Sequence, residues 1–483
     1  MSKTIKSITN PKLSLNILTP QEVQRLHEAT LHIIENVGVR FPSKRALDIW
    51  QAYGAAVDPG KMIVRAKPHL IEDALQKAPP AYTLAARDPT QDLPLDGNHV
   101  FVGTDGCGVE VLDLQTGQRR TSCLQDVVDI ARIADTTEEV AFHWVPVSAQ
   151  DKPPTTRGLH ELKVIWENST KHVQTESIYN EREARAAIEM AALVAGGKAE
   201  LRRRPVLSVM QCSASPLGHD GGSLDAALVA AEHGLPTGFM TMAACLTTGP
   251  ATMAGNLAVG NAEVIAATAL LQLAYPGAPV FYAAAQTASD LRTGAYTGGG
   301  PEDFLFGAAT NVLADFYHIP LSMGSFATGA KEPNWQAGLE NSMSTFMASI
   351  VMSDMLLGVG LLHGSRIWSY AQMMLDCEIF AIIHKMMQGI VVDDDTLALD
   401  TMAAVGPGGN FLTQKHTRQH MRDVFLSQFM DRRPYNDWET KKDDARDWAL
   451  DKARRLLAEH QPEPLDAKLS AEMAKIIISL ENE

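Results

Sequence analysis

The segment "PVLSVMQCSASPLGHDGGSLDAALVAAEHGLPTGFMTMAAC", residues 205–245, carries the pattern on which the fold depends. Two short apolar runs, 205–212 and 236–245, are bounded by turn-forming residues, and a helical pattern lies between them. Such an order is typical of two parallel strands joined by a crossover helix.

The same rhythm continues along the chain. Further strand-like runs occupy residues 140–147, 172–177, 279–285, 320–326 and 356–362, and helical patterns separate most of them. With one more strand, at 100–104 or 125–138, eight units would close a TIM barrel. A doubly wound open sheet is the alternative, which is weakened because no G-x-G-x-x-G follows an early strand.

The chain outside this repeated pattern looks different. A capped helix starting at Thr19, a second helix near 67–78 and a hairpin turn at Thr116-Gly117 predict an α+β cap region. We expect this cap in residues 1–122, the barrel in residues 123–400 and a C-terminal helical extension in residues 401–483.

The composition excludes several classes of protein. The chain has 483 residues, 45% hydrophobic and 20% charged, with a formal net charge of -15. A nucleic-acid partner is not expected, because no long basic run is present. The most apolar window, 251–275, contains Asn256, Asn261 and Glu263, which favours a core helix over a membrane span. Five scattered cysteines and a polar N-terminus favour a cytoplasmic protein.

The loops after the expected strands are where a barrel carries its chemistry. They are rich in small neutral residues and lack the carboxylate pair that a glycosidase needs, so we expect a roomy, lightly charged site. His363, in "LLGVGLLHGSRIWSY" (356–370), follows the last strand and is the expected catalytic residue. A structural hydrogen bond is its alternative role.

Histidines elsewhere give a weaker metal signal. His416 and His420 stand at i, i+4 spacing, which suits a helical pair of metal ligands. No H-E-x-x-H motif accompanies them, and no third ligand is evident nearby. We therefore favour a surface or interface helix there, and expect no bound metal.

Aromatic and cationic residues near the strand ends suggest a pocket for a cation with an anionic tail. An aromatic cage would hold an alkylated ammonium by cation–π attraction, and a cation beyond it would hold a carboxylate. The cage candidates are Trp368, Tyr370, Tyr282 and Phe326, and the anchor candidates are Arg292, Lys331 and Arg366. Core packing is the competing interpretation for each aromatic residue.

Several segments together resemble the trimethylamine methyltransferase superfamily over about residues 14–470. Among them are "NVGVRFPSKRALDIWQAYGAAVD", "VLDLQTGQRR", "NAEVIAATALLQLAYPGAPVFY", "DLRTGA", "QAGLE", "SYAQMMLDCEI", "GPGGNFL" and "DRRPYNDWE". The resemblance implies a TIM barrel and methyl transfer to a corrinoid, cobalamin. It also implies that Gln336 contacts the substrate and that Gly324 and Gly364 face the corrinoid.

The founding members of that superfamily carry pyrrolysine, whereas this chain has ordinary residues throughout. We expect the equivalent position near Met323-Gly324. The chain therefore resembles the non-pyrrolysine branch, whose members demethylate quaternary amines such as glycine betaine. A quaternary nitrogen leaves as a neutral amine, so binding and alignment suffice without a general acid.

The chain lacks a D-x-H-x-x-G cobalamin motif, so the corrinoid is expected on a partner protein. The leading hypothesis is a homo-oligomeric methyltransferase of one-carbon metabolism that acts on glycine betaine. Proline betaine, carnitine, choline or a tertiary amine are alternative donors, and a non-catalytic betaine-binding protein is a further alternative. The helical segment 434–483 is a candidate for assembly.

Overall fold

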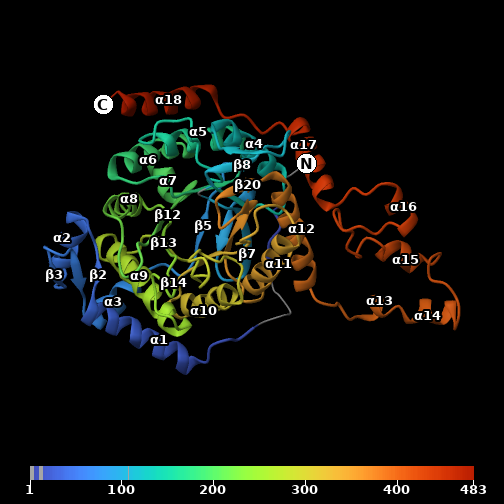
Figure 1. Ribbon diagram of the computed structural model, residues 1–483, viewed down its shortest axis with the longest axis horizontal. Helices are drawn as coiled ribbons and strands as arrows, with labels where there is room; N and C mark the ends of the chain where they lie inside the picture. The colour runs from blue at the N-terminus through green and yellow to red at the C-terminus, as the bar shows by residue number, and fades with distance from the viewer. Residues whose placement is uncertain (1–4, 10–14, 107, 483) are drawn as a thin grey trace.

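The computed structural model describes residues 5–9, 15–106 and 108–482, and its centre is a closed barrel of eight parallel strands (Figure 1). β18 pairs with β7 in parallel, which closes the barrel. The expected TIM barrel is therefore confirmed. In barrel order the strands are β7 (His99–Thr104), β10 (Phe142–Trp144), β11 (His172–Thr175), β12 (Leu207–Cys212), β13 (Thr237–Thr241), β15 (Val280–Ala284), β17 (Leu321–Gly324) and β18 (Met355–Val359).

A helix follows every barrel strand and covers its outer face. These helices are α4 (Leu124–Thr136), α5 (Arg157–Asn168), α6 (Glu181–Ala195) with α7 (Lys198–Arg203), α8 (Gly221–Glu232), α9 (Met253–Ala274), α10 (Pro301–Tyr317), α11 (Trp335–Ile350) and α12 (Tyr370–Met387). Of the two candidates for the eighth strand, residues 100–104 form it, and residues 125–136 lie in a helix. The barrel thus begins inside the range 1–122 that was expected to be cap.

The barrel interior is filled by large side chains that lie against glycines of the neighbouring strand. Phe101, Phe142, Met210, Phe281 and Met355 form one buried cluster there. Such layers make the lower part of a TIM barrel a packed core.

Two close approaches in this layer require glycine. A Cβ at Gly103 would lie 2.5 Å from the Phe142 ring, and one at Gly238 would lie 2.2 Å from the Phe281 ring.

A short hairpin closes the N-terminal end of the barrel. It consists of β5 (Tyr82–Leu84) and β6 (Leu93–Leu95), joined through the 3-10 turn η2 (Pro89–Gln91). Leu84, Leu93 and Leu95 pack into the interior cluster, and the Tyr82 hydroxyl donates to the Val280 carbonyl at 3.0 Å. The interior is therefore covered at this end.

The N-terminal region lies against one side of the barrel. It contains β1 (Ile8–Thr9), α1 (Pro20–His32) with the π-turn η1 (Ile33–Val37), β2 (Val39–Arg40), α2 (Lys44–Ala52), β3 (Ala56–Asp58), β4 (Ile63–Arg65) and α3 (Pro68–Leu75). Thr19 caps α1 as expected, with Glu22 completing a capping box. The Asn261 amide of α9 donates to Thr30 of α1 at 2.7 Å, which fixes the two helices together.

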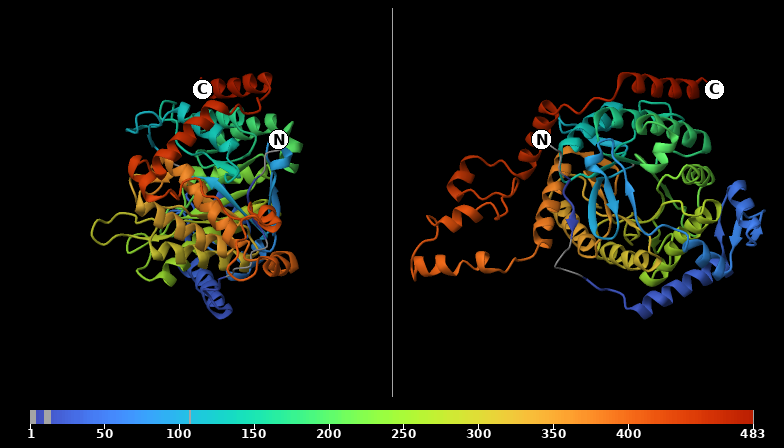
Figure 2. Two further views of the ribbon diagram at one scale, coloured as in Figure 1. Left: turned by 90° about the vertical axis from the view of Figure 1, so that its right-hand side faces the viewer. Right: turned by 180° about the vertical axis from the view of Figure 1, so that it is seen from behind.

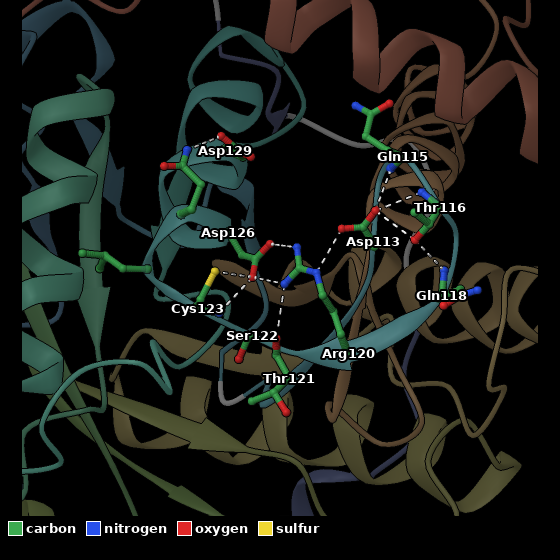
Figure 3. Close-up of polar contacts among 12 residues, drawn as sticks. Asp113, Gln115, Thr116, Gln118, Arg120, Thr121, Ser122, Cys123, Asp126 and Asp129 are labelled. Atoms are coloured by element: carbon green, nitrogen blue, oxygen red, sulfur yellow. Dashed lines mark hydrogen bonds and ion pairs between the residues drawn. The ribbon is translucent and has the colours of Figure 1, made fainter.

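A four-stranded sheet extends the barrel at its C-terminal end. It runs β19 (Leu361–Leu362), β20 (Ile367–Ser369), β8 (Glu110–Leu112) and β9 (Arg119–Thr121), so the loop after β18 pairs with the loop after β7. Arg120 of β9 holds this sheet to α4 through two bonds of 2.8 Å to the carboxylate of Asp126, and it also bonds Asp113 of the β8–β9 turn at 3.0 Å (Figure 3). A bidentate pair of this kind fixes orientation as well as distance.

Helix α9 is a core helix. Among the described residues it is the one helix long and apolar enough to cross a membrane, and 94% of its apolar window is buried within the protein. Its Glu263 carboxylate accepts bonds from Ser213, Ser215 and Thr241 at 2.5 to 2.8 Å and from the Leu217 amide at 2.8 Å. The helix thereby fixes the loop that follows β12.

The C-terminal region has two parts. The helices α13 (Asp394–Leu397), α14 (Leu399–Val405), α15 (Lys415–His420) and α16 (Tyr435–Thr440) extend away from the barrel (Figures 1 and 2). The last two, α17 (Ala445–Glu459) and α18 (Ala467–Glu481), return to its outer surface. His460 reaches Asp135 of α4 at 2.7 Å, and Glu481 accepts from Thr156 at 2.8 Å.

Replacement of Gly238 by alanine tests the packing of the barrel interior. The added methyl group would meet the Phe281 ring, and overpacking of this kind costs about 1 to 3 kcal/mol. We expect Gly238→Ala to lower the midpoint of thermal unfolding measured by circular dichroism. Gly338→Ala is the matched control, because nothing lies within 4 Å of its added methyl group. Equal midpoints for the two variants would contradict the packing described.

Candidate active site

A cavity of about 780 Å³ opens at the C-terminal ends of the barrel strands. Every barrel strand, or the residue just after it, contributes to its wall. These contributions are Asp105, Trp144, Glu176, Cys212, Met240, Ala285, Gly324 and Leu357. The long loops after β15, β17 and β18 form the rim. The cavity occupies the place where TIM barrels carry their active sites.

Two buried carboxylates lie in the inner part of this cavity. Asp105 follows β7, accepts a bond from the Ser365 hydroxyl, and accepts the Gly106 amide at 2.9 Å. Its burial raises the pKa of the carboxyl to about 6, although both of these bonds oppose the rise. Glu176 follows β11 and is also buried. A cation placed here would be partnered by carboxylates in a poorly hydrated site, where such pairing is strong.

Two aromatic side chains line the same cavity. The Trp144 ring lies over Gly106, where an added Cβ would come within 2.5 Å of it. Its indole Nε1 is buried and has no hydrogen-bond partner among the described residues. Tyr296, from the loop after β15, donates its hydroxyl to the Ala285 carbonyl at 2.9 Å. Rings beside carboxylates are the environment that alkylated ammonium groups prefer.

Cationic side chains gather at the rim. Arg292 pairs with Asp290 at 2.8 Å, yet its side chain is 88% exposed. Lys331 donates to the Gly329 carbonyl at 2.5 Å, and Arg366 lies 3.3 Å from Glu110. Two of these cations are thus paired with carboxylates, and Lys331 adds a third cationic side chain at the entrance.

His363 lies in a tight turn between β19 and β20. His363, Gly364 and Ser365 all have φ between 57° and 63°, and backbone bonds from His363 to Ala330 and from Gly364 to Thr328 hold the turn. Burial, with Lys331 and Arg366 nearby, lowers the pKa of His363, so the imidazole is neutral near pH 7. Its Nδ1 has no partner among the described residues.

Seven of the residues proposed from the sequence line this cavity: His363, Arg292, Lys331, Arg366, Gln336, Gly324 and Gly364. The Gln336 amide donates to Glu340 at 2.9 Å, so part of its hydrogen-bonding capacity is already used.

The four aromatic residues proposed as a cage do not line the cavity; Trp368, Tyr370, Tyr282 and Phe326 are buried in the main core. Tyr282 follows Phe281, which points inward, so strand alternation turns Tyr282 toward the helices. Trp368 packs over Gly360, where an added Cβ would lie 2.5 Å from its ring, and meets Tyr370 edge-on. Core packing, the competing interpretation, describes where these rings are.

The expectation of a lightly charged site was wrong. Four carboxylates line the cavity, namely Asp105, Glu176, Asp290 and Glu340. Each comes from a different strand end or following element, so no pair is visible in the sequence. The aromatic residues Trp144 and Tyr296 were also missed, and only the strand register could have singled out Trp144.

The His416–His420 pair gains a third neighbour in the structure. Asp395 of α13 lies with them, with its carboxylate 3.2 Å from His420 Nε2, a spacing that could hold a metal ion. The other nitrogen of His420, Nδ1, bonds Asp423 at 2.8 Å, and these contacts raise the pKa of His420. An imidazolium between two carboxylates satisfies this geometry without a metal. We interpret the cluster as a brace between α13 and α15.

A sequence profile described as trimethylamine methyltransferase (MTTB) matches residues 1–483. The chain belongs to the trimethylamine methyltransferase family.

Two relatives from Desulfitobacterium hafniense are each 33% identical. The trimethylamine methyltransferase MttB of strain DCB-2 aligns over 96% of this chain and 93% of its own length. The glycine betaine methyltransferase of strain Y51 aligns over 96% of both chains. The chain is thus a methyltransferase of this family, but equal identity to both relatives does not choose between their substrates.

The fold agrees with a solved structure of a more distant protein. The crystal structure of the Methanosarcina barkeri monomethylamine methyltransferase (MtmB) matches with a TM-score of 0.53 over 91% of this chain and 92% of that chain, at 12% identity. This likeness supports the barrel architecture alone.

The reactivity of Cys212 tests the polarity of the cavity. Burial raises the pKa of this thiol, and the Glu176 carboxylate 4.0 Å away raises it further. We expect slow alkylation of Cys212 by iodoacetamide at pH 8, measured by peptide mass spectrometry, because the thiolate is the reactive form. Glu176→Gln should speed it several-fold.

The unmodified protein is the control for this variant. Equal alkylation rates of Cys212 in the two proteins would contradict the acidic environment described here.

Proposed function

We propose that this protein transfers a methyl group from a quaternary amine, with glycine betaine the best fit, to a corrinoid carried by a partner protein. The observation that carries the proposal is the polarity of the cavity. The carboxylates of Asp105 and Glu176 and the Trp144 ring belong to the barrel strand ends, and Tyr296 stands on the loop after β15. Three cationic side chains stand on the rim loops, two of them paired with carboxylates. Betaine has a permanent cation at one end and a carboxylate at the other, which matches this order.

These carboxylates and rings would grip the ammonium group. Trp144 and Tyr296 would offer ring faces, each worth roughly 0.5 to 2 kcal/mol when water is excluded. The carboxylates of Asp105 and Glu176 would offset the cost of removing the cation from water. Together these groups would fix the direction of one methyl group toward the mouth.

The rim residues would hold the carboxylate of the donor. Arg292 and Lys331 come from the loops after β15 and β17, so they approach from one side of the mouth. Arg292 would need to share its guanidinium between Asp290 and the donor, which its exposure permits. Carnitine and proline betaine keep both charges and remain alternative donors, whereas choline and tertiary amines lack the carboxylate.

Glycines in the cavity wall would leave room for a flat macrocycle at the mouth. Gly298, Gly300, Gly324, Gly329 and Gly364 all line the cavity. Gly324, near the position expected to match pyrrolysine, ends β17 facing inward, while Met323 points outward against Gly307 of α10. Reduced cobalamin on a partner would supply the nucleophile that accepts the methyl group.

The residues of this chain would act by binding the donor, excluding water from it and aligning its methyl group. A quaternary nitrogen departs as a neutral amine, so no residue has to protonate it. His363, neutral at the rim, would then orient the bound groups by hydrogen bonding. We also propose that the working unit is a cytoplasmic homo-oligomer.

A screen of methylated amines tests the substrate class. We expect anaerobic incubation with reduced corrinoid and glycine betaine to yield dimethylglycine, detected by NMR. Choline should react at least about tenfold more slowly, because it lacks a charge-assisted bond to the rim. Arg292→Gln and Lys331→Met should slow betaine turnover and leave choline turnover unchanged, with exposed Arg203→Gln as control.

Equal turnover of choline and betaine would eliminate the carboxylate anchor. Betaine binding without any dimethylglycine would favour a non-catalytic betaine-binding protein instead.

The pH dependence of cation binding tests the role of Asp105. Its carboxyl, with a pKa of about 6, is neutral below that pH and anionic above it. We expect the affinity for betaine, measured by calorimetry, to rise with pH up to about 6 and then level off.

Asp105→Asn should weaken binding about tenfold at pH 8 and abolish this rise. Ser365→Ala keeps the carboxylate but loses a bond that favours its charged form, so its rise should move to higher pH. A flat profile in the unmodified protein would contradict the assignment.

A further inference from the structure

The segment 388–426, here called the arm, leaves the end of α12 and projects from the barrel (Figures 1 and 2). It carries α13, α14 and α15. The chain is anchored again just after it, where the Gln428 amide donates to Glu378 of α12 at 2.9 Å. The structure describes every residue of the arm, and none of them belongs to the hydrophobic core.

The arm exposes an unusual amount of apolar side chain. Leu412 is 78% exposed and Leu426 is 80% exposed. The other exposed apolar residues of the arm include Val391, Val392, Leu397, Leu399, Met402, Phe411, Met421, Val424 and Phe425. Large exposed apolar surfaces on a folded protein mark interaction sites. A standard stable interface buries roughly 800 Å² on each partner, which requires many such residues together.

The arm nevertheless has a defined shape. His420 bridges Asp395 and Asp423, and the Thr417 hydroxyl donates to the Phe411 carbonyl at 2.6 Å. His416 reaches the Asp395 carbonyl at 3.0 Å. These bonds join α13 to α15 with little help from core packing, so the apolar side chains are presented by a folded element.

The same chain also carries an apolar groove along α11 and α12, which extends from the cavity end at Trp335 to Phe429, where the chain is anchored after the arm. It has a volume of about 560 Å³ and lies between α11, α12 and the residues around Phe429. Trp335 at its edge is 79% exposed, and Leu339 and Met343 continue the apolar surface along α11. The arm of the same chain leaves this groove open.

We propose that the arm of one copy docks in the α11–α12 groove of a second copy, and that the exchange is reciprocal. The arm and the groove are both exposed and apolar, and a two-fold axis would use both of them twice. Reciprocal exchange also buries both arms at once, which doubles the apolar area removed from water. This inference goes beyond the proposed reaction, for which the cavity of one chain supplies all the binding groups.

The position of the arm favours a second copy over a corrinoid-carrying partner. Helix α12 runs back along the barrel from the cavity end, so its last residue, Met387, lies near the opposite end. A protein that delivers a methyl acceptor must face the cavity mouth. The arm therefore starts far from the surface that such a partner needs.

Removal of apolar side chains from the arm tests the proposal. We expect sedimentation analysis at micromolar concentrations to show a dimer, or a multiple of dimers, for the full-length protein. The double variant Leu412→Asp with Leu426→Asp should be a monomer, and so should Trp335→Asp. Ile478→Asp, on the exposed face of α18, is the matched control and should assemble like the unmodified protein. Unchanged far-ultraviolet circular dichroism spectra and cooperative thermal unfolding would show that the variants fold.

A mixing experiment separates arm–groove exchange from arm–arm packing. The arm variant keeps an intact groove, and Trp335→Asp keeps an intact arm. Mixed in equal amounts, they should form heterodimers through one intact contact, more weakly than the unmodified protein. Absence of heterodimers would overturn the exchange.

A monomeric unmodified protein would overturn the whole proposal. If the arm is protected from hydrogen exchange only when a corrinoid protein is added, the arm binds that partner and the proposal of a second copy is wrong. None of these outcomes depends on which amine is the substrate.

Discussion

The parallel pairing of β18 with β7 is the constraint on which the rest of the structure depends. Once the sheet is closed, each strand must point alternate side chains inward and outward, and a shift of one residue would reverse all of them. This rule places Phe281 inside and Tyr282 outside, and it places Gly324 inside and Met323 outside. It also brings eight strand ends to one cavity, where residues far apart in the sequence become neighbours.

The sequence could predict the barrel because its strands are short apolar runs separated by long helical patterns. It could not choose between residues 100–104 and 125–138 for the eighth strand. The β7 run lies within a series of short strands and turns whose pattern predicts a cap region. The cationic residues of the rim could be predicted from the sequence, because Arg292, Lys331 and His363 follow apolar runs.

The aromatic lining could not be predicted from the sequence. Whether an aromatic residue at a strand end faces the cavity or the helices depends only on the register of its strand. Trp144 lies in a run of apolar residues in which nothing local marks its direction. Asp105 and Glu176 were overlooked for a related reason. A single carboxylate after one strand carries no signal until barrel closure sets it beside another.

Burial gives these carboxylates their significance. Asp105 is deprived of water and is only partly compensated by Ser365 and Gly106, so its negative charge is costly until a cation arrives. Glu263 illustrates the opposite case, since four donors surround it and leave it a structural role. Two buried acids near one barrel end are thus distinguished by how completely their oxygens are already bonded.

The β5–β6 hairpin has a consequence for the order of events. Because Leu84, Leu93 and Leu95 cover the lower end of the interior, traffic between the cavity and solvent has to pass the rim. A large protein docked over that rim would trap whatever lies beneath it. Under the proposed reaction the donor must therefore enter before the acceptor protein docks. The demethylated amine can leave only after that protein has dissociated. Steady-state kinetics would then follow a compulsory sequence, in which excess acceptor protein slows turnover by blocking the entrance of the empty enzyme.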